Sequence, residues 1–196
     1  SCTMLMNMAD AHQAVSGGEL KPAVLPGAKE YQLHSNFTNK DYRIQVLPVG
    51  NVKELGYSVL YVLDGDALFP AVAGMAQNMM ARAEETNAVP FLIVGIGYPN
   101  TLLLNPPERS QDYTPPSENY ENTGDKVNRQ FGGAEHFYRF IQEELLTDLA
   151  QRFHINKSQQ NIFGHSYGGL FGLYSLLNHP EGFRNYLIAS PSVWWN

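Results

Sequence analysis

The sequence contains one cysteine, few charged side chains and no long apolar run. The single cysteine, Cys2, excludes a disulfide within the chain and a metal cluster built on cysteines. The net charge of −6 argues against a nucleic-acid-binding surface. Charged residues make up only 16% of the chain, and no apolar run approaches the roughly 20 residues that span a bilayer. The sequence therefore predicts neither a nucleic-acid partner nor a membrane span.

Hydrophobic residues, by contrast, make up 43% of the 196 residues, and aromatic residues make up 12%. This composition is typical of a folded chain, and a chain of this length buries about 70% of its unfolded surface in one domain. Residues 1–30 are small and polar without a strong period, so we interpret them as an N-terminal arm before a domain at 31–196. Cys2 is a candidate for lipid attachment behind a removed signal peptide; the compartment and the oligomeric state stay open.

Six segments have the character of β-strands. Residues 42–47 alternate in character, and residues 31–35 pair with them in a hairpin across 36–41. Four further runs are almost entirely apolar, which is typical of parallel strands buried on both faces. These runs are 58–63, 91–97, 161–165 and 186–189.

Apolar residues at helical spacing lie between these runs, at 67–85, 134–153 and 170–178. The last of these segments is apolar nearly all round and is predicted to be buried. Strands that alternate with helices predict an α/β fold: a mostly parallel sheet with helices on both faces and antiparallel strands at its N-terminal edge. Residues 98–133 break this alternation and carry five prolines. We interpret them as a long loop at the carboxyl edge of the sheet, where ligands bind in such folds.

The main chemical signal is the pattern G-x-S-x-G at 164–168. A buried strand precedes Ser166 and a buried helix follows it, which places this serine on a tight strand–helix turn with its hydroxyl facing the cleft. Gly164 and Gly168 supply the small residues that such a turn needs. The backbone N–H of Tyr167 begins the helix and is free to bind an oxyanion. The alternative is a glycine-rich turn that carries an incidental serine.

An oxyanion hole needs a second donor, which usually comes from the loop after the third strand. That loop is 63–67 in this chain, and we expect the backbone N–H of Asp66 to be the donor. Turn formation and helix capping are the alternative roles of Asp64 and Asp66. They are compatible with an oxyanion role for the Asp66 backbone.

Five segments together carry a family pattern. They are 61–65, 109–115, the pair at 132–133 with the helix after it, 164–169 and 190–196. These motifs resemble the putative-esterase family of α/β-hydrolases, which includes esterase D and the enterochelin-type trilactone siderophore esterases. The resemblance runs from about residue 30 to the last residue. The resemblance implies an α/β-hydrolase fold, serine ester hydrolysis and the oxyanion role of Asp66. One departure is Gln111, where relatives often carry a second basic residue. An anionic substrate such as an iron–catecholate complex would lose a cation there.

Three side chains are candidates for substrate binding. Arg109 is a cation on the long loop, and its alternative role is an ion pair with Asp112 that shapes this loop. His165 adjoins the candidate nucleophile, although its position on the strand predicts a side chain that points away across the sheet. Trp194 follows the last strand. It and Trp195 line the pocket or belong to the core, and we expect at least one of them in the core.

The sequence lacks an obvious base for this serine. In this fold the acid and the histidine of the triad follow the nucleophile, but only Glu181 and His179 do so here. His179 lies 13 residues on, about 20 Å along a helix that leads away from the active edge. Among the earlier histidines only His136 is a conceivable stand-in, and its alternative is an ordinary residue at a helix start. We therefore expect a C-terminally truncated domain, whose full enzyme adds about 70–100 residues with the acid and the histidine.

The sequence thus predicts a serine hydrolase that cleaves carboxylic esters through an acyl-enzyme on Ser166. Its partner is a small-molecule ester, either of the siderophore-lactone type or a general acyl or aryl ester, and the reaction needs no metal or organic cofactor. One alternative is an acyltransferase on the same site, with an alcohol in place of water. Another is a non-catalytic binding domain that keeps the fold. The chain by itself is expected to be inactive if the base lies beyond it.

Overall fold

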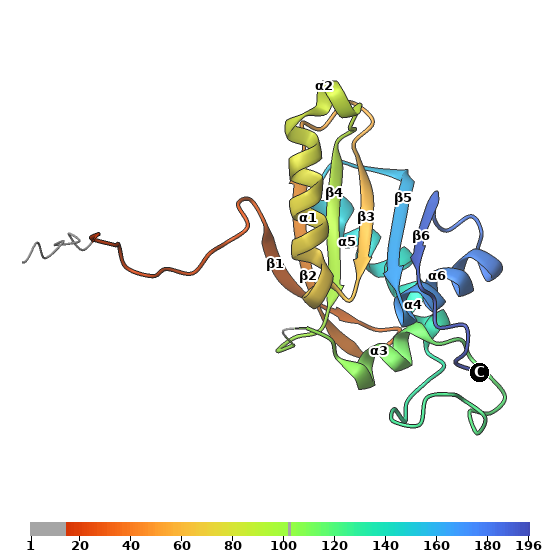
Figure 1. Ribbon diagram of the computed structural model, residues 1–196. Helices are drawn as coiled ribbons and strands as arrows, with labels where there is room; N and C mark the ends of the chain where they lie inside the picture. The colour runs from red at the N-terminus through yellow and green to blue at the C-terminus, as the bar shows by residue number, and fades with distance from the viewer. Residues whose placement is uncertain (1–14, 102) are drawn as a thin grey trace, which may run out of the picture.

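The fold is a six-stranded sheet covered by helices, seen in a computed structural model that describes residues 15–101 and 103–196 (Figure 1). Its strands are β1 (Lys29–Ser35), β2 (Lys40–Val49), β3 (Tyr57–Leu63), β4 (Phe91–Gly97), β5 (Ile155–His165) and β6 (Asn185–Ala189). They lie in the order β1-β2-β4-β3-β5-β6. β2 pairs antiparallel with β1 and β4, and the other neighbours are parallel. The expected mostly parallel sheet with antiparallel strands at its N-terminal edge is confirmed.

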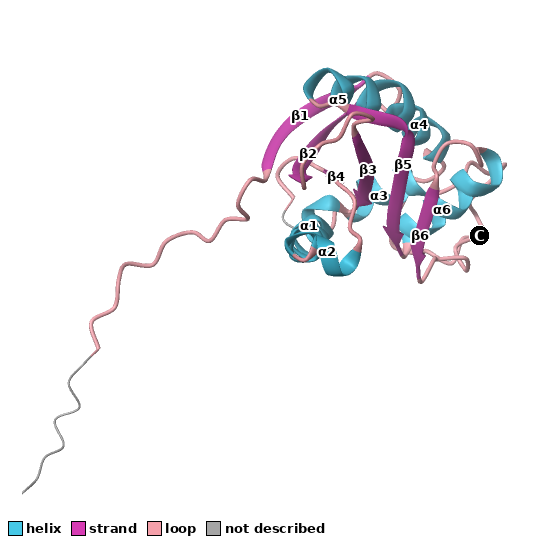
Figure 2. Ribbon diagram, turned by 90° about the horizontal axis from the view of Figure 1, so that it is seen from above, coloured by secondary structure: helices cyan, strands magenta, loops and turns pink. Residues whose placement is uncertain are grey.

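Helices cover both faces of this sheet, as expected. They are α1 (Gly65–Ala81), α2 (Ala83–Thr86), α3 (Pro106–Tyr113), α4 (Ala134–Arg139), the π-helix η1 (Phe140–Leu145), α5 (Leu146–Arg152) and α6 (Tyr167–Asn178). α1 packs on β2, β3 and β4, whereas η1, α5 and α6 contact β1, β5 and β6. Figure 2 shows these helices as two layers on opposite sides of the sheet. α3 and the C-terminus lie together at the end of the sheet to which the parallel strands point (Figure 1).

The apolar strand runs are buried because both faces of the central strands are covered. Toward α4, η1 and α6 the core is aromatic: the ring of Phe140 stacks on Tyr42 with 4.3 Å between centroids, and Phe137 meets Phe171 edge to face. Toward α1 a smaller core consists of Leu47, Val49, Val62, Phe69, Ala73 and Ile93. Burying one such side chain contributes roughly 1.5–3 kcal/mol, so these two cores hold the elements that carry the site.

Residues 98–133 are not one continuous loop, because α3 lies within them. Asn105 caps this helix, since its side chain accepts a hydrogen bond from the backbone N–H of Glu108 at 3.3 Å. Pro106 and Pro107 occupy the first turn, where a proline sacrifices no helical hydrogen bond. The prolines that favoured a loop are therefore helix-start signals, and the expectation is wrong for the 8 residues of α3.

Two predicted helices differ in detail from the structure. Residues 134–153 form α4, η1 and α5 in succession rather than one α-helix. α6 begins at Tyr167, and its first half is buried as expected. Its last turn is not buried, since Leu176 and Leu177 are 39% and 80% exposed. The apolar pattern alone therefore overstates the burial of this helix.

The predicted N-terminal arm is described only in part. Residues 15–28 form no helix or strand, and β1 begins at Lys29. The end of the arm touches α1, where Gln77 Nε2 donates to the carbonyl of Pro26 at 3.0 Å. Cys2, the candidate for lipid attachment, lies outside the described residues. In the described part of the chain, no helix combines the length and apolarity needed to cross a membrane.

Candidate active site

Ser166 lies on the turn between β5 and α6. Its backbone has φ 60° and ψ −115°, a conformation that residues other than glycine rarely adopt. Such a residue costs about 1–3 kcal/mol and persists only where the surrounding structure enforces it. A Cβ on Gly164 would overlap the carbonyl oxygen of Gly168, so the turn requires glycine at 164. The hydroxyl-bearing residue at the centre of this turn is partly exposed.

The segment after β6 packs directly against this turn. The Ser166 backbone N–H donates to the carbonyl of Ala189 at 3.0 Å, and the Ser192 N–H donates to the carbonyl of Ser166 at 3.1 Å. The hydroxyl oxygens of Ser166 and Ser192 also lie 3.0 Å apart. A Cβ on Gly169 would lie 3.1 Å from the Pro191 Cα, so glycine permits this close approach. Sequence reasoning missed Ser192; the signal for it is its position three residues after β6, the strand that neighbours β5.

Tyr167 follows the serine and begins α6. Its backbone N–H therefore belongs to the first turn, where N–H groups have no partner within the helix. Its ring lies 5.3 Å from the guanidinium carbon of Arg109 and 6.0 Å from the ring of Trp194. Its hydroxyl donates to Asp125 at 2.5 Å. Residues from α3, from the loop after α3 and from the end of the chain thus meet at Tyr167.

The two tryptophans at the end of the chain have different surroundings. Trp194 is 61% exposed beside Tyr167. Trp195 is only 4% exposed, and its ring packs on those of Tyr120 and Phe131 at 5.9 and 5.6 Å. The expectation that at least one tryptophan belongs to the core is confirmed.

Asp66 lies in the first turn of α1, so its backbone N–H also has no partner within its helix. Its carboxylate accepts hydrogen bonds from the Tyr98 backbone N–H at 2.7 Å and from Arg43 Nη1 at 3.1 Å. A Cβ at Gly97 would overlap this carboxylate, so glycine leaves the space that the carboxylate occupies. Burial raises the pKa of Asp66, although Tyr98 and Arg43 act in the opposite direction. These contacts fix the position of the Asp66 backbone.

Asp64 is the turn residue before α1, with a left-handed backbone at φ 52°. Its side chain does not cap the helix, so the predicted capping role is wrong while the turn role is confirmed. The carboxylate binds Arg109 instead, at 2.7 Å to Nε and 2.8 Å to Nη2. Burial would lower the pKa of Arg109, but the hydrogen bonds and charge of Asp64 raise it. This ion pair borders the serine turn, since a Cβ on Gly168 would lie 3.8 Å from the Asp64 carboxylate.

Asp112 does not bind Arg109, so the alternative ion pair predicted from the sequence is wrong. Asp112 accepts hydrogen bonds from the hydroxyls of Tyr98 and Tyr42, at 2.7 and 2.9 Å, and from Lys40 Nζ at 3.1 Å. Burial raises the pKa of Asp112, although Lys40 and both tyrosines act to lower it. Asp112 therefore ties α3 to β2 and β4.

Neither histidine next to the site contacts the serine as a base would. Among the described residues, no histidine hydrogen-bonds to the hydroxyl of Ser166. His165, at the end of β5, and His136, in α4, are both exposed. Within residues 15–101 and 103–196, no three His, Cys, Asp or Glu side chains form a group that could hold a metal ion.

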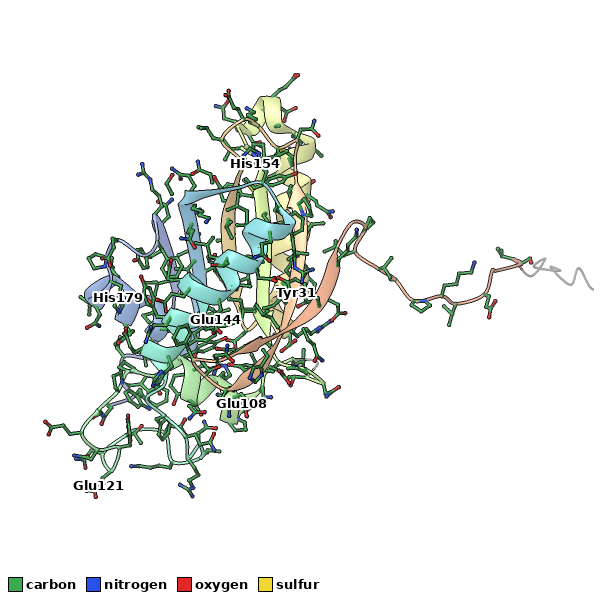
Figure 3. All side chains as sticks on the ribbon, turned by 180° about the vertical axis from the view of Figure 1, so that it is seen from behind. Tyr31, Glu108, Glu121, Glu144, His154 and His179 are labelled. Carbon is green, nitrogen blue, oxygen red and sulfur yellow. The ribbon has the colours of Figure 1, made fainter. Side chains whose placement is uncertain are left out.

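Two further histidines lie away from the serine. His179 follows α6, binds Glu135 at 2.8 Å and stacks on the ring of Tyr138, so it is engaged in the helical layer. His154 lies at the opposite end of the sheet from Glu108 of α3, as Figure 3 shows. These positions agree with the sequence expectation that neither histidine reaches the serine.

The arrangement as a whole suits nucleophilic acyl transfer. It offers a serine hydroxyl on a strained strand–helix turn, at the edge of the sheet where α1 and α6 begin. Nucleophilic serine chemistry needs an accessible hydroxyl, and an oxyanion needs N–H donors of the kind found at helix starts.

The chain is similar in sequence to proteins named as siderophore esterases. Residues 35–196 match the family model described as Putative esterase. The chain is 35% identical over 185 residues to the ferri-bacillibactin esterase BesA of Bacillus subtilis, an alignment that covers 92% of this chain and 64% of BesA. It is 36% identical over 154 residues to the siderophore enterobactin esterase of Emericella nidulans, which covers 75% of this chain and 50% of that protein. The chain thus spans less than two thirds of the length of these curated relatives.

Solved structures share the architecture. The BES protein from Bacillus cereus aligns with a TM-score of 0.81 at 34% identity, over 93% of this chain and 68% of that protein. The described sheet, its helical layers and the match over most of the sequence therefore lead to the same conclusion: the chain belongs to the putative-esterase family of α/β-hydrolases.

Proposed function

We propose that Ser166 is the nucleophile of a serine esterase that acts on siderophore-type carboxylic esters. The observation that carries this proposal is the backbone of Ser166, at φ 60° and ψ −115°, on the turn from β5 to α6. A serine held in this conformation presents its hydroxyl at the carboxyl edge of the sheet, where substrates bind in open α/β folds. The relatives named as esterases of ferri-bacillibactin and enterobactin support the class of reaction and of substrate.

In the proposed reaction, Ser166 Oγ attacks the ester carbonyl carbon while its proton passes to a general base. The electron pair of the carbonyl bond moves to oxygen, and the backbone N–H groups of Asp66 and Tyr167 bind this oxyanion. The tetrahedral intermediate collapses to an acyl-enzyme, and the leaving alkoxide takes the proton from the base. Water, deprotonated by the same base, then releases the carboxylic acid and restores the serine.

The general base is not assigned to a described residue. The hydroxyl of Ser166 contacts that of Ser192, which is not basic. Activity is therefore tested on the protein expressed from its natural gene, beside the 196-residue chain given by the sequence.

We expect the substrate to contact three side chains around the serine turn. His165 and Trp194 are both exposed there, and an aromatic face at Trp194 suits an aryl or catecholate group. Arg109 is 8% exposed, and Asp64 engages its Nε and Nη2. This leaves Nη1 as the atom of Arg109 for a substrate contact. The neutral Gln111 adds no second cation, which favours an ester of low charge over a highly anionic complex.

The experiment compares Ser166→Ala with Ser158→Ala, an exposed serine near the other end of β5. Hydrolysis of a p-nitrophenyl ester and of a catecholate trilactone is followed for the wild type and both variants. Loss of the nucleophile is expected to reduce turnover at least about a thousandfold, whereas Ser158→Ala keeps the wild-type rate. Turnover that survives Ser166→Ala would refute the proposal.

The same samples separate the rival functions. A fluorophosphonate probe followed by mass spectrometry is expected to modify Ser166 in the wild type. Modification without hydrolysis, together with transfer of the acyl group to an added alcohol, would assign an acyltransferase. Absence of both modification and turnover would assign a non-catalytic binding domain. Faster hydrolysis of the trilactone than of the p-nitrophenyl ester would support the siderophore class.

A further inference from the structure

Ser192 is hydrogen-bonded to both the backbone and the hydroxyl of Ser166. The Ser192 N–H donates to the Ser166 carbonyl at 3.1 Å, and the two hydroxyl oxygens lie 3.0 Å apart. Ser192 is only 3% exposed, whereas Ser166 is partly exposed. One serine therefore faces the site while the other supports it from inside.

The fold holds Ser192 in this position from both sides. The chain before it continues from β6, whose Ala189 carbonyl accepts the Ser166 N–H at 3.0 Å. The chain after it returns on itself, since the Trp195 N–H donates to the Ser192 carbonyl at 3.2 Å. Trp195 is buried and its own carbonyl accepts the Gly124 N–H at 2.7 Å. The direction of the Ser192 side chain is thus fixed by backbone contacts.

The number of hydrogen bonds that a serine hydroxyl can make indicates which of the two serines donates in the Ser166–Ser192 hydrogen bond. A serine hydroxyl has one proton to donate and two lone pairs that accept. In the proposed reaction the proton of Ser166 passes to the base, and one lone pair attacks the ester. The second lone pair is left to accept a proton from a neighbour. Ser192 is the hydroxyl at that distance.

We propose that Ser192 is a further catalytic residue, whose hydroxyl donates a hydrogen bond to Ser166 Oγ and so holds and polarises the nucleophile. This inference rests on the esterase function proposed above. Ser192 keeps its proton throughout the reaction. Its hydrogen bond holds Oγ in one rotamer and stabilises the negative charge that grows on Oγ as its own proton leaves. Because that charge is largest near the transition state, the hydrogen bond raises kcat more than it lowers KM.

The rival explanation is that Ser192 is a buried hydroxyl with only a structural role. Ser192→Ala and Ser192→Cys separate the two explanations. Cysteine is somewhat larger than serine and so fills the space that alanine leaves empty, but its S–H is a weak donor. A packing role predicts that cysteine restores what alanine loses, whereas a donor role predicts that both variants stay slow. Ser190→Ala, an exposed serine two residues earlier in the same segment, is the matched control.

The test measures the rate constant of fluorophosphonate labelling, and kcat and KM for a p-nitrophenyl ester, in the protein expressed from its natural gene. Ser192→Ala and Ser192→Cys are each expected to lower the labelling rate about tenfold to a hundredfold, as for a lost hydrogen bond to a charged group. We expect kcat to fall with KM nearly unchanged, and Ser190→Ala to match the wild type. If alanine prevents folding, the cysteine variant carries the test.

Three results would overturn the proposal. Labelling within twofold of the wild type in the folded Ser192 variants would remove the catalytic role of Ser192 and leave the esterase function standing. Wild-type rates restored by Ser192→Cys would assign a packing role. A wild type that is neither labelled nor active would refute the esterase function and this inference with it.

Discussion

Arg109 binds Asp64 through two parallel hydrogen bonds, Nε to Oδ1 at 2.7 Å and Nη2 to Oδ2 at 2.8 Å, and so joins α3 to the turn between β3 and α1. The two side chains are 10% and 3% exposed. The guanidinium also lies 5.6 Å from the ring of Tyr113, whose hydroxyl accepts the Asp64 backbone N–H at 3.0 Å. This enclosed pair borders Tyr167, so it supports both elements that the proposed oxyanion hole uses.

Replacing Arg109 by Gln is expected to destabilise the fold by about 3–5 kcal/mol, because it leaves the buried carboxylate of Asp64 without its partner. Arg109→Lys keeps a positive charge but loses the planar fork that matches both oxygens. We therefore expect a smaller but still measurable loss for lysine. Urea denaturation at pH 7, followed by tryptophan fluorescence, measures the free energy of unfolding of each variant.

The matched control is Arg139→Gln. Arg139 pairs with Glu143 at 3.0 Å one turn along the helix, and both side chains are about half exposed, at 49% and 52%. Exposed pairs of this kind contribute only about 0.3–0.5 kcal/mol. Equal losses from Arg139→Gln and Arg109→Gln would contradict the structural role assigned to the buried pair.

Gly164→Ala is expected to break the serine turn. The added Cβ would overlap the carbonyl oxygen of Gly168 in the backbone of α6, which no side-chain rotation relieves. Overpacking of this kind costs typically about 1–3 kcal/mol and more when backbone must move. Thermal unfolding and fluorophosphonate labelling should both report the loss.

Gly74→Ala serves as the control for this substitution. Gly74 lies within α1, and nothing lies within 4 Å of the position that its Cβ would take. Because alanine has a higher helix propensity than glycine, the free energy of unfolding of this variant should rise by about 0.5–1 kcal/mol. A loss of stability in Gly74→Ala, or a harmless Gly164→Ala, would show that the close approach at the turn is not what requires glycine.

The elements that set the fold could be predicted from the sequence because their signals are local. The apolar runs at 58–63, 91–97 and 161–165 have the composition of strands buried on both faces, and the structure places them there. α3 could not be predicted in the same way, because its helix-start prolines are also loop signals. The exposure of Leu177 was beyond reach as well, since burial depends on which elements pack against a helix and not on its own pattern.

The candidate site likewise has parts with a local sequence signal and parts that depend on tertiary contacts. The G-x-S-x-G pattern is local and predicts the turn on which Ser166 lies. The partner of Arg109 depends on tertiary structure: Asp112 is three residues away in sequence, yet Asp64 receives the guanidinium. Ser192 depends on the pairing of β5 with β6, which brings together serines 26 residues apart. Contacts between distant segments are set by topology, and a single sequence does not contain them directly.

Asp125 is expected to make the docking of the loop after α3 sensitive to acid. Burial would raise the pKa of Asp125, but hydrogen bonds from Asn128 and Tyr167 outweigh it and lower the pKa from 3.8 to about 2. The pKa of Asp125 is therefore lower in the folded state than in the unfolded state. The stabilisation of the folded state by this carboxylate is fully present above about pH 4. It is lost as the pH falls toward 2, when the folded carboxylate is protonated.

Asp125→Asn should remove this dependence, because an amide does not titrate in this range. Between pH 4 and 2 the free energy of unfolding of the wild type should fall by up to about 1 kcal/mol more than that of Asp125→Asn, because solvent screens a carboxylate on this loop. Acid titrations followed by tryptophan fluorescence detect the change, since Trp194 contacts Tyr167, the donor to Asp125. Glu121→Gln, an exposed acid in the same loop (Figure 3), is the matched control and should follow the wild type. Parallel titrations for the wild type and Asp125→Asn would show that the Tyr167–Asp125 hydrogen bond does not hold the loop.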